Sequence, residues 1–208
     1  MKSFLTKTML CFLLLNHSFC IDNKSDKNIE SNVKGSNADD TITSEQIGKL
    51  SFKSKINQEF LQQFKGYKRD INEEEDNSKW VSYLFYVKDS TKYLEAELDE
   101  NEKEILGINT NDPFYQTKEG IKVGLNIDHL FQILNDFKIL RGNSEDYLIY
   151  LPEYKMKINF NKLRFKDPEF AEEMINVNSK NKESIFKMID ARNVLITDIA
   201  ISLKPLPD

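Results

Sequence analysis

The chain has 208 residues, with 34 acidic and 29 basic side chains and a formal net charge of −5. Nonspecific nucleic-acid binding depends on neutralising phosphates, so a mildly acidic chain leads us to expect no nucleic-acid partner. Both cysteines, Cys11 and Cys20, lie near the N-terminus. Residues 21–208 therefore cannot form a disulfide, a zinc–thiolate site or a cysteine nucleophile.

The first 20 residues are typical of an export signal. Lys2 and Lys7 give a positively charged start without an acidic residue, and an apolar run follows over residues 9–15. This run is shorter than the ~20 apolar residues that cross a bilayer. We therefore expect a signal peptide over residues 1–20 and export to the cell envelope, either to the periplasm or to an anchor in the outer membrane.

The end of this signal leaves two kinds of processing open. In the first, Ser18 and Cys20 are the small residues before a cleavage site that follows Cys20. In the second, residues 15–20 form a degenerate lipobox, and an acylated Cys20 becomes the N-terminus of a lipoprotein whose lipid anchors it to a membrane. His17 and Phe19 depart from the usual lipobox residues. Loss of residues 1–20 removes two lysines, which leaves 27 basic against 34 acidic residues and a charge of −7.

Residues 21–50 are polar, with scattered single aliphatic residues and no periodicity. Such a segment buries too little apolar surface to offset its ordering entropy, so we expect a disordered tether over 21–50. The pattern changes at Ser51. Residues 51–208 predict a single α+β domain, an antiparallel sheet of hairpins and meanders with a few helices packed mainly on one face.

The elements of this domain follow from hydrophobic periodicity. A helix is predicted over residues 56–64 and a charged loop over 69–79. Residues 80–87 are aromatic and β-branched and predict the strongest strand, which we expect in the centre of the sheet. Further strands are predicted over 93–98, 105–108, 147–151, 156–160 and 194–203, a loop over 109–116, and helices from Asp167 and over 185–189.

The clearest stretch is Thr117–Phe137. Gly120 is expected at positive φ in a turn, residues 121–125 alternate as a short strand, and Asn126 is placed to cap a helix. The apolar residues of that helix recur at the spacing of one helical face: Ile127, Leu130, Phe131, Leu134 and Phe137.

Few residues could carry chemistry. His129 is the only histidine outside the signal, and we place it on the solvated side of the predicted helix, away from any nucleophile. Glu95 and Glu97 lie two residues apart on one strand face, close enough to influence each other's pKa. A solvated sheet face explains them more simply than a catalytic pair, which would need a partner acid on another strand.

The sequence lacks the common motifs of catalysis and cofactor binding. There is no G-x-S-x-G elbow, Walker A loop or G-x-G-x-x-G turn. The acidic run Glu73–Asp76 lacks the alternating ligands and glycine turn of a calcium loop. We therefore expect no catalytic residue, no metal site and no cofactor.

The segment T-K-E-G-I-K-V-G over residues 117–124, with the helix that follows, resembles a module in exported bacterial proteins and lipoproteins, in which a T-K-E-G-I-x-V-G turn and strand lead into a short helix between β-hairpins. The later hairpin and the closing strand at Ile199–Ile201 are also similar. Leu125–Asn126 replaces the usual Ser or Thr before the helix. The resemblance implies a fold and an exported location, but no activity. A weaker likeness is to small outer-membrane assembly lipoproteins.

These observations favour an exported cell-envelope protein, a lipoprotein if Cys20 is acylated. We expect a non-enzymatic binding or assembly module whose partner is a protein or a small apolar ligand. One alternative is a carboxylate-dependent hydrolase of the envelope that uses residues such as Glu95 and Glu97. Another is an immunity-type inhibitor that blocks a basic toxin with an acidic surface.

Overall fold

The computed structural model describes residues 38–73, 78–86, 91–142, 146–175, 182–190 and 193–204. These residues belong to one compact unit, Lys34–Asp208. The expected signal peptide over residues 1–20, with Cys20, and the first part of the expected tether, residues 21–37, lie outside the described residues.

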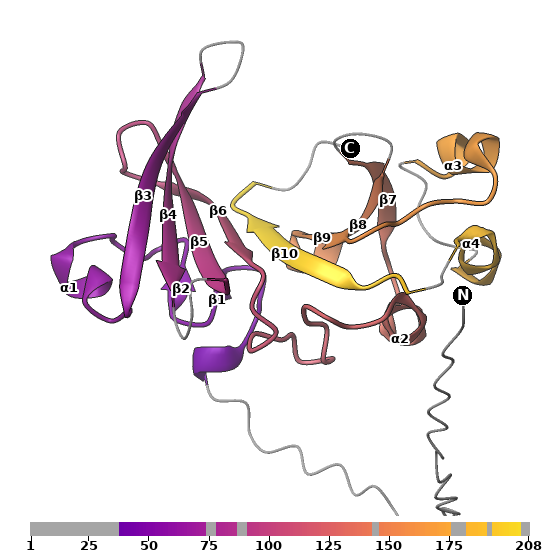
Figure 1. The fold of residues 1–208 in the computed structure, drawn as a ribbon, viewed down its shortest axis with the longest axis horizontal. Helices are drawn as coiled ribbons and strands as arrows, with labels where there is room; N and C mark the ends of the chain where they lie inside the picture. The colour runs from indigo at the N-terminus through magenta and orange to yellow at the C-terminus, as the bar shows by residue number, and fades with distance from the viewer. Residues whose placement is uncertain are drawn as a thin grey trace, which may run out of the picture. The chain divides into compact units, whose positions relative to one another are not determined.

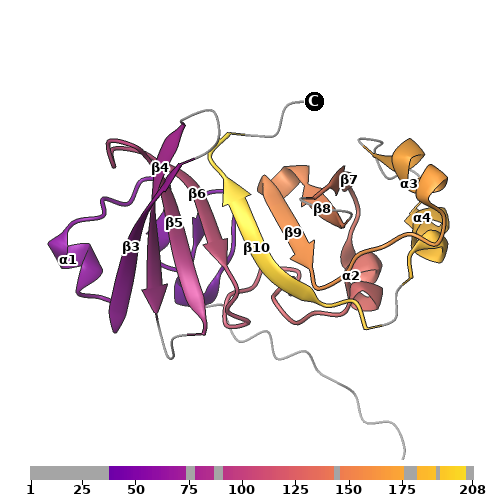
Figure 2. The ribbon, with the colours of Figure 1, turned by 45° about the horizontal axis from the view of Figure 1, so that its top comes forward.

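Eight strands form one antiparallel sheet in the order β3-β4-β5-β6-β10-β9-β8-β7 (Figure 1). Their bounds are β3 (Gly66–Glu73), β4 (Lys79–Tyr86), β5 (Tyr93–Asp99), β6 (Ile105–Thr110), β7 (Lys138–Arg141), β8 (Tyr147–Leu151), β9 (Met156–Phe160) and β10 (Ile196–Ser202). Strand β10 comes from the end of the chain and joins the β3–β6 meander to the β7–β9 meander (Figure 2). The predicted α+β class with an antiparallel sheet is confirmed.

The helices are short. They are α1 (Gln58–Leu61), α2 (Ile127–Ile133), α3 (Pro168–Met174) and α4 (Lys182–Met188), with 3₁₀ turns η1 (Ala38–Asp40) and η2 (Pro152–Tyr154). Figure 1 shows α1 at the β3 end of the sheet and α2, α3 and α4 at the β7 end. Aromatic contacts join them to the core, such as Phe60 against Phe85 at 5.7 Å and Phe131 against Phe137 at 5.1 Å between ring centroids.

The sheet has one apolar and one polar face because its strands alternate. In β5, every second residue is buried and those between are partly exposed. The apolar row crosses the sheet through Ala96, Ile108, Ile201 and Met156, which are paired across strands and are all fully buried. Burial of such aliphatic side chains contributes about 1.5–3 kcal/mol each, so this face holds the main core.

The helix prediction at residues 117–137 is confirmed in its main features. Gly120 has φ +86°, and Asn126 caps α2 by accepting a hydrogen bond from the N–H of Asp128 at 2.8 Å. All five predicted face residues are buried: Ile127, Leu130, Phe131, Leu134 and Phe137. The helix ends earlier than predicted, at Ile133, so Phe137 packs from the segment that leads into β7.

The predicted strand over residues 121–125 is wrong. This segment is a turn with single bridges from Lys122 to Gln116 and from Asn126 to Leu195. Gly124 has φ +83°, a left-handed conformation that breaks an extended strand. The alternation was nevertheless informative, since Ile121 and Val123 are buried.

The predicted boundary between tether and domain at residue 50 is also wrong. The described part of that segment contains η1 and the small hairpin of β1 (Gln46–Ile47) and β2 (Leu50–Ser51). Ile42, Ile47 and Leu50 are almost completely buried in the core. Three single aliphatic residues were enough to fix the segment because each of them reaches the core from a turn or a short strand.

Two further predictions need correction. Residues 69–79 were expected to form a loop, but residues 66–73 form β3, which pairs with β4 along its whole length. Charged side chains are common on edge strands, which is why the hydrophobic pattern missed it. Strand β4 is therefore second from the edge and not central. Strand β7 was not predicted, because only four residues form it.

Candidate functional site: a polar cleft on the sheet

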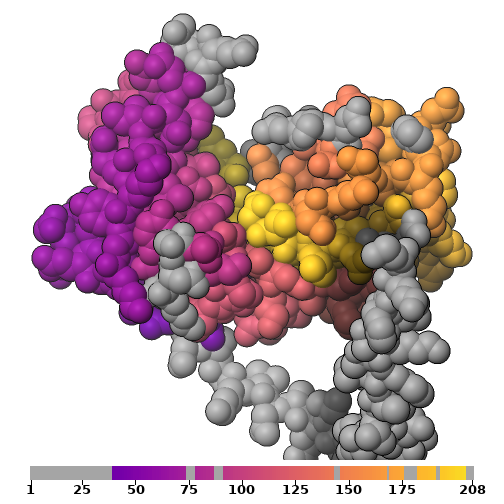
Figure 3. Space-filling view, in the orientation of Figure 1, coloured from indigo at the N-terminus to yellow at the C-terminus, as the bar shows by residue number. Residues whose placement is uncertain are grey.

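The polar face of the sheet contains a cleft of about 590 Å³. Figure 3 shows the hollow above β10, between the two meanders. Its lining comes from six strands and the β7–β8 turn: Glu97, Gly107, Asn109, Arg141, Gly142, Asp146, Tyr147, Leu148, Lys157, Asn159, Phe160, Ala200, Ile201 and Ser202. Most of these side chains are polar, so the cleft suits a ligand that forms hydrogen bonds.

Glu97 occupies the β5 side of the cleft because its strand partner has no side chain. Gly107 on β6 is the residue directly opposite Glu97. A Cβ at Gly107 would lie 2.6 Å from Oε2 of Glu97, closer than atoms of this kind approach. The glycine therefore leaves the space into which the carboxylate folds.

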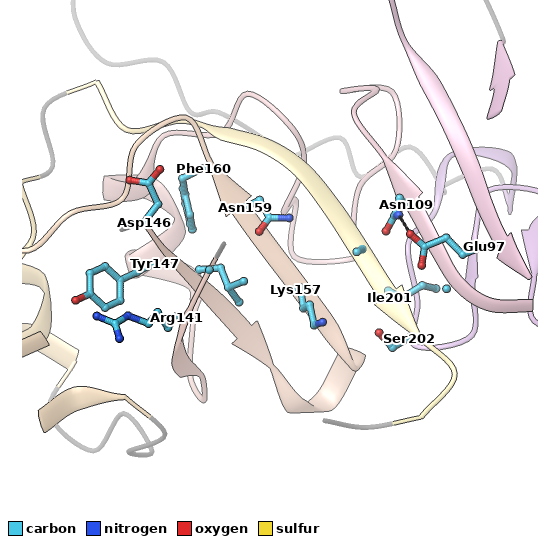
Figure 4. Close-up of a pocket in the computed structure, with 14 residues that line it drawn as sticks. Glu97, Asn109, Arg141, Asp146, Tyr147, Lys157, Asn159, Phe160, Ile201 and Ser202 are labelled. Carbon is cyan, nitrogen blue, oxygen red and sulfur yellow. Dashed lines mark hydrogen bonds between the residues drawn. The ribbon is translucent and has the colours of Figure 1, made fainter. Parts of the chain in front are cut away.

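Asn109 holds the two acids of β5 together. Its Nδ2 donates to Oε1 of Glu97 at 2.8 Å and to Oε2 of Glu95 at 3.2 Å, and Figure 4 shows the bond to Glu97. The two acceptor oxygens consequently lie within about 6 Å of each other, since both are bonded to one nitrogen. Burial raises the pKa of Glu97, and the charge of Glu95 raises it further, against the opposing effects of Asn109 and Lys157.

The opposite side of the cleft is built by β9 and β10. Lys157 and Asn159 lie on the same face of β9, and Nδ2 of Asn159 donates to Oδ1 of Asp198 at 2.5 Å. Tyr93 lies on the polar face of β5. Burial raises the pKa of Tyr93, and the charges of Asp198, Glu95 and Glu97 act in the same direction.

The cations at the far end are already paired with acids. Arg141 Nη2 lies 2.9 Å from Oε1 of Glu172, and Arg164 Nε lies 3.5 Å from Oδ1 of Asp146. Figure 4 shows Arg141, Asp146 and Tyr147 at the end of the cleft away from Glu97. The cleft therefore offers carboxylates and amides at one end, and at the other end Arg141 and Asp146, each of which forms an ion pair with a residue outside the lining.

Two candidates for chemistry were predicted, His129 and the pair of Glu95 and Glu97. Only the acid pair contributes to the cleft, through Glu97. Glu95 and Glu97 share a strand face, as expected, and are joined by Asn109. His129 is exposed on α2 and does not line the cleft, in agreement with its predicted solvated position. Two residues of the cleft were not predicted: Asn109, which was assigned to the loop over 109–116, and Lys157, whose alternation in the strand over 156–160 indicated only a polar face.

A second hollow, of about 390 Å³, lies near the β1–β2 hairpin and is more apolar. Phe64, Leu94, Phe114 and Tyr115 contribute its apolar lining. Burial raises the pKa of the Tyr115 phenol to about 12. Gly48 packs against this ring with φ +56°, and a Cβ there would lie 2.5 Å from Cε1 of Tyr115.

Within the described ranges, no group of three or more His, Cys, Asp or Glu side chains could hold a metal ion. No helix in the part of the chain that the structure describes is long and apolar enough to cross a membrane.

The comparisons with known proteins bear on the fold. No protein-family model matches the sequence, and no curated protein sequence matches it. Among solved structures, the chain is similar to the crystal structure of the uncharacterized protein yfeY from Escherichia coli, with a TM-score of 0.52 and 9% sequence identity over 78% of this chain and 99% of that one. At this identity the likeness establishes a shared α+β fold and transfers no function.

Proposed function

We propose that the protein is a non-enzymatic binding module of the cell envelope and that the polar cleft is its ligand site. The observation that carries this proposal is the cluster of Glu97, Glu95 and Asn109 on an open, hollowed sheet face. Burial removes the Glu97 carboxylate from bulk water and raises its pKa. A ligand that donates hydrogen bonds to Glu97 would offset this cost, because paired buried carboxylates are far more stable than unpaired ones.

The chemistry of the cleft favours binding over reaction. Neither histidine nor cysteine is among its lining residues, and Arg141 at its far end is paired with Glu172. Carboxylate and amide oxygens near Glu97 would accept bonds from hydroxyl, amide or ammonium groups of a ligand. The side-chain oxygen of Asn109 would accept a hydrogen bond from the same ligand, since its Nδ2 already donates to Glu95 and Glu97. We therefore infer a polar ligand rich in hydrogen-bond donors.

The location of the protein in the cell envelope is part of this proposal and rests on the sequence. The charged and apolar leader over residues 1–20 supports export, and acylation of Cys20 would anchor the module to a membrane. The resemblance of residues 117–124 to exported proteins and lipoproteins supports the same location. An inhibitor of a basic toxin would need a clustered, unpaired acidic face; acids such as Asp39, Glu45 and Asp70 are instead paired with lysines.

One observation favours the alternative of a carboxylate-dependent hydrolase. General acids require a raised pKa, and burial raises that of Glu97 beside a second carboxylate. In retaining glycosidases the two carboxyl groups lie about 5–5.5 Å apart and flank the scissile bond. Here Glu95 and Glu97 stand side by side on one strand and share one amide donor, which suits a common ligand group better than opposite sides of a bond.

The proposal is tested with NMR titrations of the labelled chain against soluble cell-wall saccharides, short peptides and small amines. Compounds that bind should shift the backbone amides around Glu97, Asn109 and Lys157. Gly107→Ala should weaken this binding by about tenfold, because the new methyl displaces the flexible Glu97 carboxylate. Gly66→Ala is the matched control, since a Cβ on that strand glycine meets nothing within 4 Å.

Two outcomes would contradict the binding proposal. If shifts appear elsewhere and leave the cleft unchanged, the ligand site is misplaced. If a saccharide is cleaved and Glu97→Gln abolishes the cleavage while binding persists, the hydrolase alternative is correct.

A further inference from the structure

The outer side of β3 is an open sheet edge. All eight residues from Gly66 to Glu73 pair with β4 on the inner side, and no described residue forms a backbone bridge on the outer side. The other edge of the sheet differs, because Ile139 of β7 forms a bridge with Ile175. An unpaired row of N–H and C=O groups is a template for another strand.

Two apolar side chains are exposed along this edge. Tyr67 is 46% exposed and Ile71 is 65% exposed. Both lie on the core face of the sheet, opposite Phe85 and Val81 of β4. They extend the apolar face of the sheet beyond the part that is covered, which is unusual for an edge that only meets solvent.

We propose that β3 pairs antiparallel with β3 of a second copy of the chain. Alternate residues of a strand direct their backbone groups to the same neighbour. In an antiparallel pair of identical strands, the two residues that exchange backbone hydrogen bonds must both direct their N–H and C=O groups away from β4. Both residue numbers are then odd or both are even, so the numbers of each facing pair add up to an even total. Near the middle of β3, this leaves registers with Lys68, Arg69 or Asp70 on the axis.

The charged side chains select the register with Arg69 on the axis. It places Lys68 opposite Asp70 of the second copy, and the twofold axis repeats this pair. Within one chain, Nζ of Lys68 already lies 2.6 Å from Oδ2 of Asp70. The four side chains of the dimer would consequently alternate in charge around the axis.

The apolar side chains favour the same register. It places Tyr67 opposite Ile71 of the second copy, so that the exposed apolar residues cover each other. Just outside these pairs, Lys65 faces Glu73 of the second copy. Hydrophobic contact and charge complementarity therefore agree on one alignment of the two strands.

The two other registers are less favourable. With Asp70 on the axis, two aspartates face each other and Tyr67 faces Glu73 of the second copy. With Lys68 on the axis, two lysines meet and Tyr67 faces Arg69. In the preferred register the self-facing residue is Arg69, whose guanidinium is already paired with Glu102 of its own chain, which reduces the repulsion on the axis.

The test is the oligomeric state of the full chain. A contact of eight residues is small, so we expect a dissociation constant on the order of 10–1000 µM. Sedimentation velocity over this concentration range should show a reversible monomer–dimer equilibrium. Asp70→Lys and Lys68→Asp should each weaken it by about tenfold or more, since each places like charges opposite each other.

Mixing the two charge variants provides the sharper result. In their heterodimer, the Asp70→Lys chain has lysine at both positions and the Lys68→Asp chain has aspartate at both. Every lysine then faces an aspartate, so the mixture should associate where neither variant does alone. Lys122→Asp, at an exposed position away from β3, is the control for charge reversal and should leave the equilibrium unchanged. Thermal melts verify that each variant is folded.

A wild type that stays monomeric at about 1 mM would overturn the proposal. So would variants that dimerise as well as the wild type, or a mixture that associates no better than its components. Because the cleft lies on other strands, loss of dimerisation with unchanged ligand shifts separates this proposal from the proposed function.

Discussion

Asn109 donates one hydrogen bond to Glu97 and another to Glu95, at 2.8 and 3.2 Å from the same nitrogen. The bond lowers the pKa of Glu97, although burial and Glu95 raise it by more. Removal of the amide in Asn109→Ala should therefore raise the pKa of Glu97 further. The measurement is a carbon-13 NMR titration of the Glu97 carboxyl, and an unchanged or lower pKa would contradict this geometry.

The same pKa shift makes stability depend on pH. The pKa of Glu97 is raised above its ordinary value of 4.5, so just above pH 4.5 the folded chain keeps a proton that the unfolded chain releases. The free energy of unfolding should consequently fall as pH rises from 4.5 through the folded pKa. Glu97→Gln should lack this component in urea melts across that range. Glu59→Gln, at an exposed position on α1, controls for loss of one charge; equal slopes in both variants would refute the prediction.

Glycines at positive φ should tolerate substitution according to their surroundings. Gly120 has φ +86° and open space around it, so Gly120→Val should cost only backbone strain, about 1–3 kcal/mol. Gly48→Ala should cost more, because its Cβ would also approach Cε1 of Tyr115 to 2.5 Å and the carbonyl oxygen of Asp39 to 2.9 Å. Gly66→Ala has neither problem and should be nearly neutral. Urea midpoints in the reverse order would show that contacts at these turns relax freely.

The two sides of α2 should respond differently to truncation. Leu130 is fully buried, so Leu130→Ala should destabilise the fold by about 2–5 kcal/mol. His129 is exposed, and His129→Ala should cost less than about 0.5 kcal/mol and leave any cellular phenotype intact. Loss of function in His129→Ala with an unchanged melt would place this histidine in a site and would refute the proposed cleft.

The proposed address is tested at the N-terminus, outside the described residues. If Cys20 is acylated, Cys20→Ser should move the protein from the membrane fraction to the soluble fraction. Mass spectrometry of the wild type should find a lipid on Cys20. A free N-terminus at Ile21 would show instead that cleavage follows Cys20 and that the protein has no lipid at this position.

Local features of the fold were predictable from the sequence and long-range ones were not. Asn126, Leu130 and Phe131 lie close together in the chain, so a cap and a helical face could be recognised without knowledge of the rest. The cleft unites Glu97 with Lys157 and Ser202, which are far apart in the chain. They meet only because β10 inserts between β6 and β9, and no periodicity within one segment encodes that pairing.

The errors also have physical causes. Ile42 and Leu50 occur among polar residues, and only the three-dimensional fold shows that they are buried. In β3, the edge position lets Lys68 and Arg69 stand in a strand, which removes the alternation on which prediction depends. Glycine gave opposite results: Gly120 was placed correctly in a turn, whereas Gly124 breaks the strand that its neighbours predicted.

The position of β10 in the sheet limits how much of the sheet can form during synthesis of the chain. This strand follows all the other strands of the sheet in the chain, yet it lies between β6 and β9 in the middle of the sheet. Until β10 has been synthesised, β6 is paired only with β5 and β9 only with β8, so each of the two meanders has an open edge. A nascent chain that stalls or is clipped before Ile196 would expose both edges at once, so quality-control proteases and chaperones would meet a half-built sheet that is prone to aggregate.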